Sequence, residues 1–283
     1  ASKMNDRACK STILLVLSIV MHSTAEHNIA AATTKQAPRQ LESSVGRIVG
    51  GYEAQISQFP YQVSIQQEGV HRCGGAIYSA TIIVSAAHCF ELWDMPELFA
   101  VRAGSSEHER GGVYLPVRRI FVHPHFQPAN GINDDIAVLA LTYSLPFSVN
   151  IQPIALASNA DMEVAYHTVY FVSGWGTVTE DSRLRSPRLR FVTVQQFEQR
   201  SCKAAYSSTV RVTEGMLCAG ALGGGRDSCK GDSGGPLVGY ARGRYLLMGV
   251  VSFGIGCGRA GIPGIYTRVA EYKDWIELAA KQI

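Results

Sequence analysis

The ten residues from Asp227 to Pro236 combine groups that could carry out acyl transfer. Ser233 supplies a hydroxyl, and three glycines lie within two residues of it. Glycine allows backbone angles that a Cβ forbids and lets another molecule approach closely. A tight turn here could aim backbone N–H groups at an oxyanion forming beside the hydroxyl. A surface turn is the competing interpretation, because serine alone is a poor nucleophile and needs a base.

His88 is the best candidate for that base among the eight histidines. It follows an apolar strand end and the small residues 85–87, which leave room for its ring to reach into a cleft. Asp135 is the candidate that would orient the ring. It heads the apolar run 136–141, where an unpaired carboxylate would be costly to bury. A carboxylate that accepts from the imidazole Nδ1–H would fix the tautomer that base catalysis requires.

Short strands must position these three residues. Apolar, β-branched segments bounded by turn residues recur along the chain, which predicts an all-β sandwich or barrel. The expected strands are 61–65, 76–78, 81–84, 99–102, 117–122, 135–141, 168–172, 190–194, 237–239, 245–252 and 264–267. Pro146 and Pro153, near the midpoint, suggest a linker between two β domains. An apolar stripe predicts a helix over 270–283, and a second short helix is expected around 196–205.

The N-terminus has the pattern of targeting and processing segments. Three basic residues precede an apolar run over 13–21, and small residues follow, which predicts a signal peptide over 1–25. A buried N-terminal helix is the alternative. Residues 26–47 resemble a flexible propeptide, and Arg47 at its end is a good protease target. We therefore expect a secreted chain whose mature part, residues 48–283, begins at Ile48.

Charge and cysteine content support an extracellular protein. The chain holds 26 Lys or Arg and 23 Asp or Glu, of which residues 1–47 hold six and three, so residues 48–283 have no net charge. This balance favours neither nucleic acid nor a membrane surface as a partner. Six of the seven cysteines follow the predicted signal peptide. An even count in a secreted chain indicates three disulfides, with fifteen pairings open. Zinc ligation is disfavoured, because no paired Cys or His spacing occurs.

Three motifs together resemble the chymotrypsin-like serine protease family. They are SAAHC at 85–89, NDDIAVL at 133–139 and GDSGGP at 231–236, and the similarity extends over residues 48–283. The resemblance implies two antiparallel six-stranded β-barrels, divided near 146–156, with a C-terminal helix. It also implies that His88, Asp135 and Ser233 form the catalytic triad. Asp134 is the less favoured orienting residue. The backbone N–H groups of Gly231 and Ser233 would form the oxyanion hole.

The same resemblance implies how substrate is selected and how the enzyme is activated. Asp227 would lie at the bottom of the primary specificity pocket and bind Lys or Arg, which indicates a trypsin-like member. The other implied pocket residues are Ser228, Ser252, Gly254 and Gly264. Cleavage after Arg47 would free the Ile48 ammonium to pair with Asp232. The implied disulfides are Cys73–Cys89, Cys202–Cys218 and Cys229–Cys257, a three-disulfide pattern similar to that of many invertebrate trypsins.

Some positions depart from the family pattern. Lys230 places a positive charge at the pocket mouth, and Phe253 stands where tryptophan is common. The loop 105–112 is shorter than a calcium-binding loop, and two carboxylates do not make a six-oxygen site, so we expect no metal and no cofactor. Protein substrates and protein inhibitors are the expected partners of a monomeric digestive enzyme. A cascade protease and a catalytically inactive binding protein are the alternatives.

Overall fold

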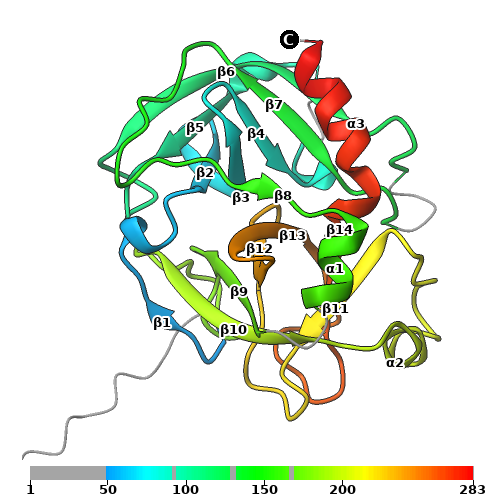
Figure 1. Ribbon diagram of the computed structural model, residues 1–283. Coiled ribbons are helices and arrows are strands. Elements are labelled where there is room, and N and C mark those ends of the chain that lie inside the picture. Colours follow the sequence, from blue (N-terminus) through cyan, green and yellow to red (C-terminus); the bar gives the residue numbers. More distant parts are fainter. Residues whose placement is uncertain (1–48, 91–93, 128–131, 166–168, 283) are drawn as a thin grey trace, which may run out of the picture. The chain divides into compact units, whose positions relative to one another are not determined.

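The computed structural model describes residues 49–90, 94–127, 132–165 and 169–282. Its strands form two antiparallel barrels (Figure 1). The first barrel closes in the order β2-β3-β4-β7-β6-β5, because β2 pairs with both β3 and β5. Its strands are β2 (Gln62–Gln67), β3 (Val70–Ser79), β4 (Ile82–Ser85), β5 (Phe99–Ala103), β6 (Val113–Val122) and β7 (Ala137–Leu141).

The second barrel has six strands in the order β9-β10-β11-β14-β13-β12, and β12 pairs back to β9. These strands are β9 (Val169–Gly174), β10 (Arg190–Gln196), β11 (Met216–Gly220), β12 (Pro236–Ala241), β13 (Arg244–Phe253) and β14 (Gly264–Arg268). Two short strands lie outside this ring: β1 (Tyr52–Glu53) pairs with β10, and β8 (Ala155–Leu156) runs parallel to β13. The predicted fold of two six-stranded barrels with a C-terminal helix is confirmed.

Burial differs among the predicted strands, from β6, which is mostly exposed or half-buried, to β4 and β7. Every residue of β4 and β7 is buried, so both faces of these strands pack against other parts of the protein. Strand β11 was not predicted from the sequence, although all five of its residues are buried. The short helix α1 (Asn159–Ala165) was not predicted either. A five-residue apolar segment without alternation gives little signal, since it fits a buried strand and a buried helix equally well.

The predicted helices are α2 (Gln199–Ala205) and α3 (Val269–Lys281). Three 3-10 turns complete the described elements: η1 (Ile56–Gln58), η2 (Ala87–Cys89) and η3 (Pro96–Leu98). The stripe predicted on α3 is buried at Val269, Tyr272, Ile276 and Ala279. These side chains join one apolar cluster with β7 of the first barrel and with β12 and β13 of the second. The C-terminal helix therefore packs against a core that both barrels share.

The structure forms three disulfides, Cys73–Cys89, Cys202–Cys218 and Cys229–Cys257, in the pairing that the family resemblance implies. The predicted signal peptide, the propeptide and Ile48 lie outside the described residues. Among the residues that the structure describes, no helix is long and apolar enough to cross a membrane.

Packing of α3 should contribute measurably to stability. Ile276 is fully buried, whereas Leu278 on the same helix is 56% exposed. We expect Ile276→Ala to lower the free energy of unfolding by about 2–5 kcal/mol, because it removes buried methyl groups and leaves a cavity. Leu278→Ala is the matched control and should change it by about 0.5 kcal/mol or less. Guanidinium unfolding followed by tryptophan fluorescence measures both, and equal effects would contradict this packing.

Candidate active site

His88 and Asp135 form a directly bonded pair. The His88 Nδ1–H donates to Asp135 Oδ2 at 2.7 Å, and the His88 backbone N–H donates to Asp135 Oδ1 at 2.8 Å. Nδ1 carries the proton because the oxygen of a carboxylate accepts. His88 lies in the turn η2, immediately after β4, and Asp135 lies two residues before β7. Since β4 pairs with β7, the sheet brings the two residues together. The imidazole is thus left with Nε2 as its free basic nitrogen.

Asp135 is almost fully buried, with 1% of its surface exposed. Its Oδ2 also accepts a hydrogen bond from the Ser252 hydroxyl of β13. The Thr267 hydroxyl of β14 donates to the Asp135 backbone carbonyl at 2.6 Å. The carboxylate therefore has three donors, and donors of both barrels fix its position. Thr267 was not predicted as a site residue, because a threonine within a strand carries no distinguishing signal.

The neighbouring Asp134 is directed elsewhere. Its Oδ1 accepts from the Tyr272 hydroxyl of α3 at 2.9 Å, and its Oδ2 accepts from Asn133 Nδ2 at 2.6 Å. The backbone of Asp134 has a φ of 54°, in the left-handed region. This conformation turns the chain between two adjacent aspartates. Of the two, Asp135 is the one that contacts His88, as the resemblance implies.

Ser233 lies at the tip of a tight backbone turn. The Asp232 N–H donates to Cys229 O at 2.9 Å, and the Gly235 N–H donates to Asp232 O at 2.8 Å. Gly231 has a φ of 95°, which a residue with a Cβ would adopt only under strain. The Ser233 carbonyl accepts from the Gly74 N–H at 2.8 Å, which ties the turn to the first barrel. The turn also exposes part of Ser233, whereas Asp232 beside it is fully buried.

Ser233 and His88 line one cavity of about 360 Å³ between the two barrels. Asp227 lies in the same cavity, and its other lining residues include the predicted pocket residues Ser228, Ser252, Gly254 and Gly264. At Gly264, a Cβ would lie 2.7 Å from Asp227 Oδ1, so a side chain there would obstruct the carboxylate. The cavity therefore brings together a hydroxyl, an imidazole and a buried carboxyl group. Ile132 also lines it and was not predicted from the sequence.

Asp227 places a buried carboxyl group in this cavity. Burial raises the pKa of Asp227 to about 7, although hydrogen bonds from the backbone N–H groups of Gly258 and Ser228 oppose that rise. These donors lie at 3.0 and 2.8 Å from the carboxylate oxygens. A carboxylate that loses hydration in this way gains most from a cation that enters the cavity. The Gly258 N–H donor was not predicted, because nearly every residue has a backbone N–H and the residue type does not show where it donates.

Asp232 is a second buried carboxylate, and it faces away from this cavity. Its oxygens accept from the N–H groups of Gly176, at 2.8 Å, and Cys229, at 2.9 Å. Burial raises the pKa of Asp232 to about 6. A Cβ at Gly174 or Gly176 would collide with its carboxylate, so only glycine leaves the carboxylate room at these two positions.

The chain just after the predicted activation site lies beside the cavity wall. The Val49 carbonyl accepts from the Asp227 N–H at 3.3 Å, and the Val49 side chain abuts Gly258. Arg47 and Ile48 themselves lie outside the described residues. His71, between Ser64 Oγ at 2.8 Å and the Gly231 carbonyl at 3.0 Å, supports the turn from the side of the first barrel.

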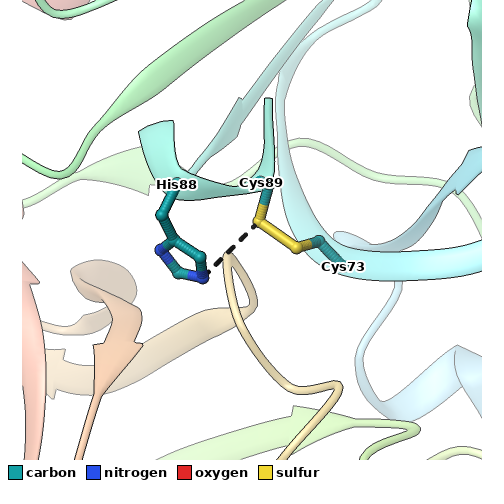
Figure 2. A group of neighbouring side chains, drawn as sticks. All are labelled: Cys73, His88 and Cys89. Carbon is teal, nitrogen blue, oxygen red and sulfur yellow. Dashed lines mark hydrogen bonds between the residues drawn. A yellow bond between two sulfur atoms is a disulfide. The ribbon is translucent and has the colours of Figure 1, made fainter. Parts of the chain in front are cut away.

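Two disulfides border the site. Figure 2 shows His88 beside the Cys73–Cys89 bond, with Nε2 4.0 Å from Cys89 Sγ. Although these three residues form a His/Cys cluster, both sulfurs are oxidised to the disulfide and offer no thiolate to a metal. On the other side of the cavity, Cys229 and Cys257 line the wall and are bonded to each other. The disulfides therefore brace the base on one side and the pocket on the other.

Lys230, Phe253 and the loop 105–112, which depart from the family pattern, are all among the described residues. Lys230 lines the cavity, and its ammonium donates to the Glu180 carbonyl at 3.0 Å. The Phe253 ring lines the cavity too and packs edge-on against Tyr206. In the short loop 105–112, the guanidinium of Arg110 pairs with the Glu107 carboxylate. The expectation that the protein binds no calcium remains a prediction.

Comparison with known proteins gives the same family as the motifs. The family model described as Trypsin matches residues 48–276. Trypsin alpha of Drosophila erecta is 43% identical over 84% of this chain and 89% of its own length. The vitellin-degrading protease of Bombyx mori is 39% identical over 82% of this chain and 84% of its own length. Transmembrane protease serine 9 of Rattus norvegicus is 44% identical over 82% of this chain. That match covers only 22% of the larger rat protein.

The raised pKa of Asp227 predicts a specific pH dependence of stability. An unfolded aspartate has a pKa near 3.8, against about 7 in the folded chain. Between these values the native state keeps a proton that the unfolded state has released, so stability falls as pH rises. Asp227→Asn removes this titration. We expect its free energy of unfolding to fall less between pH 5 and pH 7.5 than that of the parent.

Urea unfolding at the two pH values measures this difference, with Ser233→Ala in every chain to prevent self-cleavage. The matched control is Asp94→Asn at an exposed aspartate, which should keep the slope of the parent. An Asp227→Asn chain with the same slope as the parent would show that the carboxyl is not protonated in the folded state.

Proposed function

The chain belongs to the trypsin family and is a trypsin-like serine endopeptidase, and from this premise we propose that it is secreted as an inactive precursor and cleaves after Lys and Arg. The observation that carries the proposed specificity is the Asp227 carboxylate, which is 3% exposed in the cavity that holds Ser233 and His88. A substrate Lys or Arg side chain would supply the cation that this carboxylate lacks, and Arg can bind it through two N–H groups.

The proposed reaction uses the triad in two steps. Ser233 Oγ attacks the scissile carbonyl while His88 Nε2 takes its proton. The resulting imidazolium gives that proton to the leaving amine, which departs and leaves an acyl-enzyme on Ser233. Water then repeats the sequence and releases the acid. Asp135 stabilises the imidazolium through the 2.7 Å bond to Nδ1 and keeps the ring in one orientation.

The oxyanion of each tetrahedral intermediate would be bound by the backbone N–H groups of Gly231 and Ser233. The φ of 95° at Gly231 is compatible with this role, because it forms part of the tight turn that holds Ser233. One such donor typically lowers the barrier by about 3–4 kcal/mol. The Thr177 N–H donates to the Lys230 carbonyl at 2.8 Å, which would help to hold the peptide that carries the Gly231 N–H, and His71 bonds the Gly231 carbonyl of the next peptide.

The proposed activation depends on Asp232. Cutting after Arg47 would free the ammonium of Ile48, which would pair with the Asp232 carboxylate. A fully buried acid whose donors within the described part of the chain are two neutral N–H groups gains strongly from such a cation. The position of Val49 against Asp227 supports this route, because it brings the chain after Arg47 to the same part of the second barrel.

Protein substrates and protein inhibitors are the proposed partners of a monomer. A digestive role is the simplest biological assignment, and relatives named trypsin and vitellin-degrading protease support it. A restricted cascade protease is the alternative within the same class. Cleavage profiling of the activated enzyme on a peptide library separates them: a digestive enzyme accepts most residues around Lys or Arg, and a cascade enzyme accepts few.

The specificity assignment predicts the result of one substitution. Asp227→Ser should lower kcat/KM for Lys and Arg substrates by about 10³-fold or more, because the substrate cation would be buried without a partner. Asp181→Ser, at an exposed aspartate, is the control and should retain the activity of the parent. Assays with paired Arg and Phe ester substrates measure both variants. Undiminished cleavage after Arg in Asp227→Ser would refute the assignment.

The activation route predicts that Arg47→Gln remains a precursor. We expect the purified variant to show less than about a hundredth of the parent's activity after the same trypsin treatment, since the Ile48 ammonium is never released. N-terminal sequencing verifies that the bond is intact, and an active-site titrant counts competent sites. Full activity of an uncut chain would overturn the proposed role of Asp232.

A further inference from the structure

A second group of chemically active side chains lies outside the catalytic cavity. His123 and His125 follow the end of β6, and Asp134 lies shortly before β7. One ligand atom from each side chain lies within 4.8 Å of the others. His123 and Asp134 are half-buried, and His125 is exposed. The proposed protease mechanism uses none of these three residues.

The surroundings of the group hold two of its members in fixed positions. The Tyr272 hydroxyl and the Asn133 amide donate to the two oxygens of Asp134, so the carboxylate has a set orientation. The His123 ring packs edge-on against Trp275 of α3, with ring centroids 4.8 Å apart. Outer partners of this kind typically orient metal ligands and strengthen binding. The exposed His125 can rotate onto an ion that the other two residues hold.

The ligand types favour one class of ion. Imidazole nitrogens suit zinc, copper and nickel, whereas calcium and magnesium require oxygen ligands. In a tetrahedral zinc site with bonds of about 2.0–2.1 Å, the ligand atoms lie roughly 3.4 Å apart. The three ligand atoms of this group would therefore have to move closer to one another by only about 1–1.5 Å. Two histidines and one carboxylate also match the ligand number of a zinc site that keeps a position for water.

We propose that His123, His125 and Asp134 form a binding site for one divalent transition-metal ion, with zinc as its best fit. The site differs from the sequence-based expectation of a metal-free protein, because that expectation considered only local Cys and His spacing and the loop 105–112. Residues 123, 125 and 134 come together through the pairing of β6 with β7, which a search for closely spaced motifs does not reveal.

Zinc titration by calorimetry tests the site in the full chain. The parent carries His88→Ala, which removes the accessible catalytic imidazole and prevents self-cleavage. We expect the parent to bind one zinc equivalent that His125→Gln binds at least about tenfold more weakly, as expected for the loss of a direct ligand. Asp134→Asn should weaken binding similarly. Asp274→Asn is the matched control, because it removes an exposed carboxylate of α3 outside the cluster and should leave binding unchanged.

Cobalt provides a second readout, since its visible absorption reports the ligand set directly. The parent should show a four-coordinate spectrum that His125→Gln lacks. Thermal unfolding without metal verifies that His125→Gln folds as the parent does, which is expected for an exposed residue. Absence of a zinc equivalent that depends on His125, or equal weakening in Asp274→Asn, would overturn the proposal. These outcomes do not depend on protease activity, so failure here would leave the proposed function intact.

Discussion

The buried carboxylate of Asp135 requires hydrogen-bond donors, and this requirement constrains how the residues around it are arranged. A carboxylate with 1% exposure is tolerable only when its oxygens are fully bonded. Its donors are the His88 backbone and ring from the first barrel and the Ser252 hydroxyl from the second. Asp135 is therefore bonded within the first barrel, to His88, and across to the second barrel, through Ser252. Displacing the second barrel would remove the Ser252 donor from this buried carboxylate, so the packing of the barrels contributes to the position of the His88–Asp135 pair.

Two further buried carboxylates, Asp227 and Asp232, are stabilised differently. Their partners are mainly backbone N–H groups, and burial leaves the pKa of both acids raised. Both lie in the loop between β11 and β12, which the Cys229–Cys257 disulfide joins to the loop between β13 and β14. Glycine at 174, 176 and 264 leaves space around them that any Cβ would fill. The second barrel thus holds two buried acids, one in the cavity that Ser233 lines and one directly before Ser233 in the sequence.

The sequence predicted both barrels and most residues that line the cavity, because three long motifs carry the family resemblance and alternating apolar residues mark most strands. It did not predict β11 or α1, because these short segments lack a clear hydrophobic period. It also missed the donors at Thr267 and Gly258, since one is an ordinary strand residue and the other a backbone N–H. Disulfide pairing came from the resemblance alone, as six cysteines permit many pairings. Contacts between residues far apart in the chain, such as that of Asp134 with Tyr272 of α3, have no counterpart in local sequence.

The contact between Val49 and Asp227 has a consequence for cooperativity. The chain that follows the proposed activation cut forms part of the wall behind the specificity pocket, through the bond from the Asp227 N–H and the packing of Val49 on Gly258. Insertion of the new N-terminus would then change the free energy of binding in the pocket, and binding in the pocket would change the free energy of insertion. Because such coupling is reciprocal, a bound substrate would strengthen insertion by the same factor by which insertion strengthens substrate binding. The enzyme's own substrate or inhibitor would in this way act as an allosteric ligand that favours the active conformation.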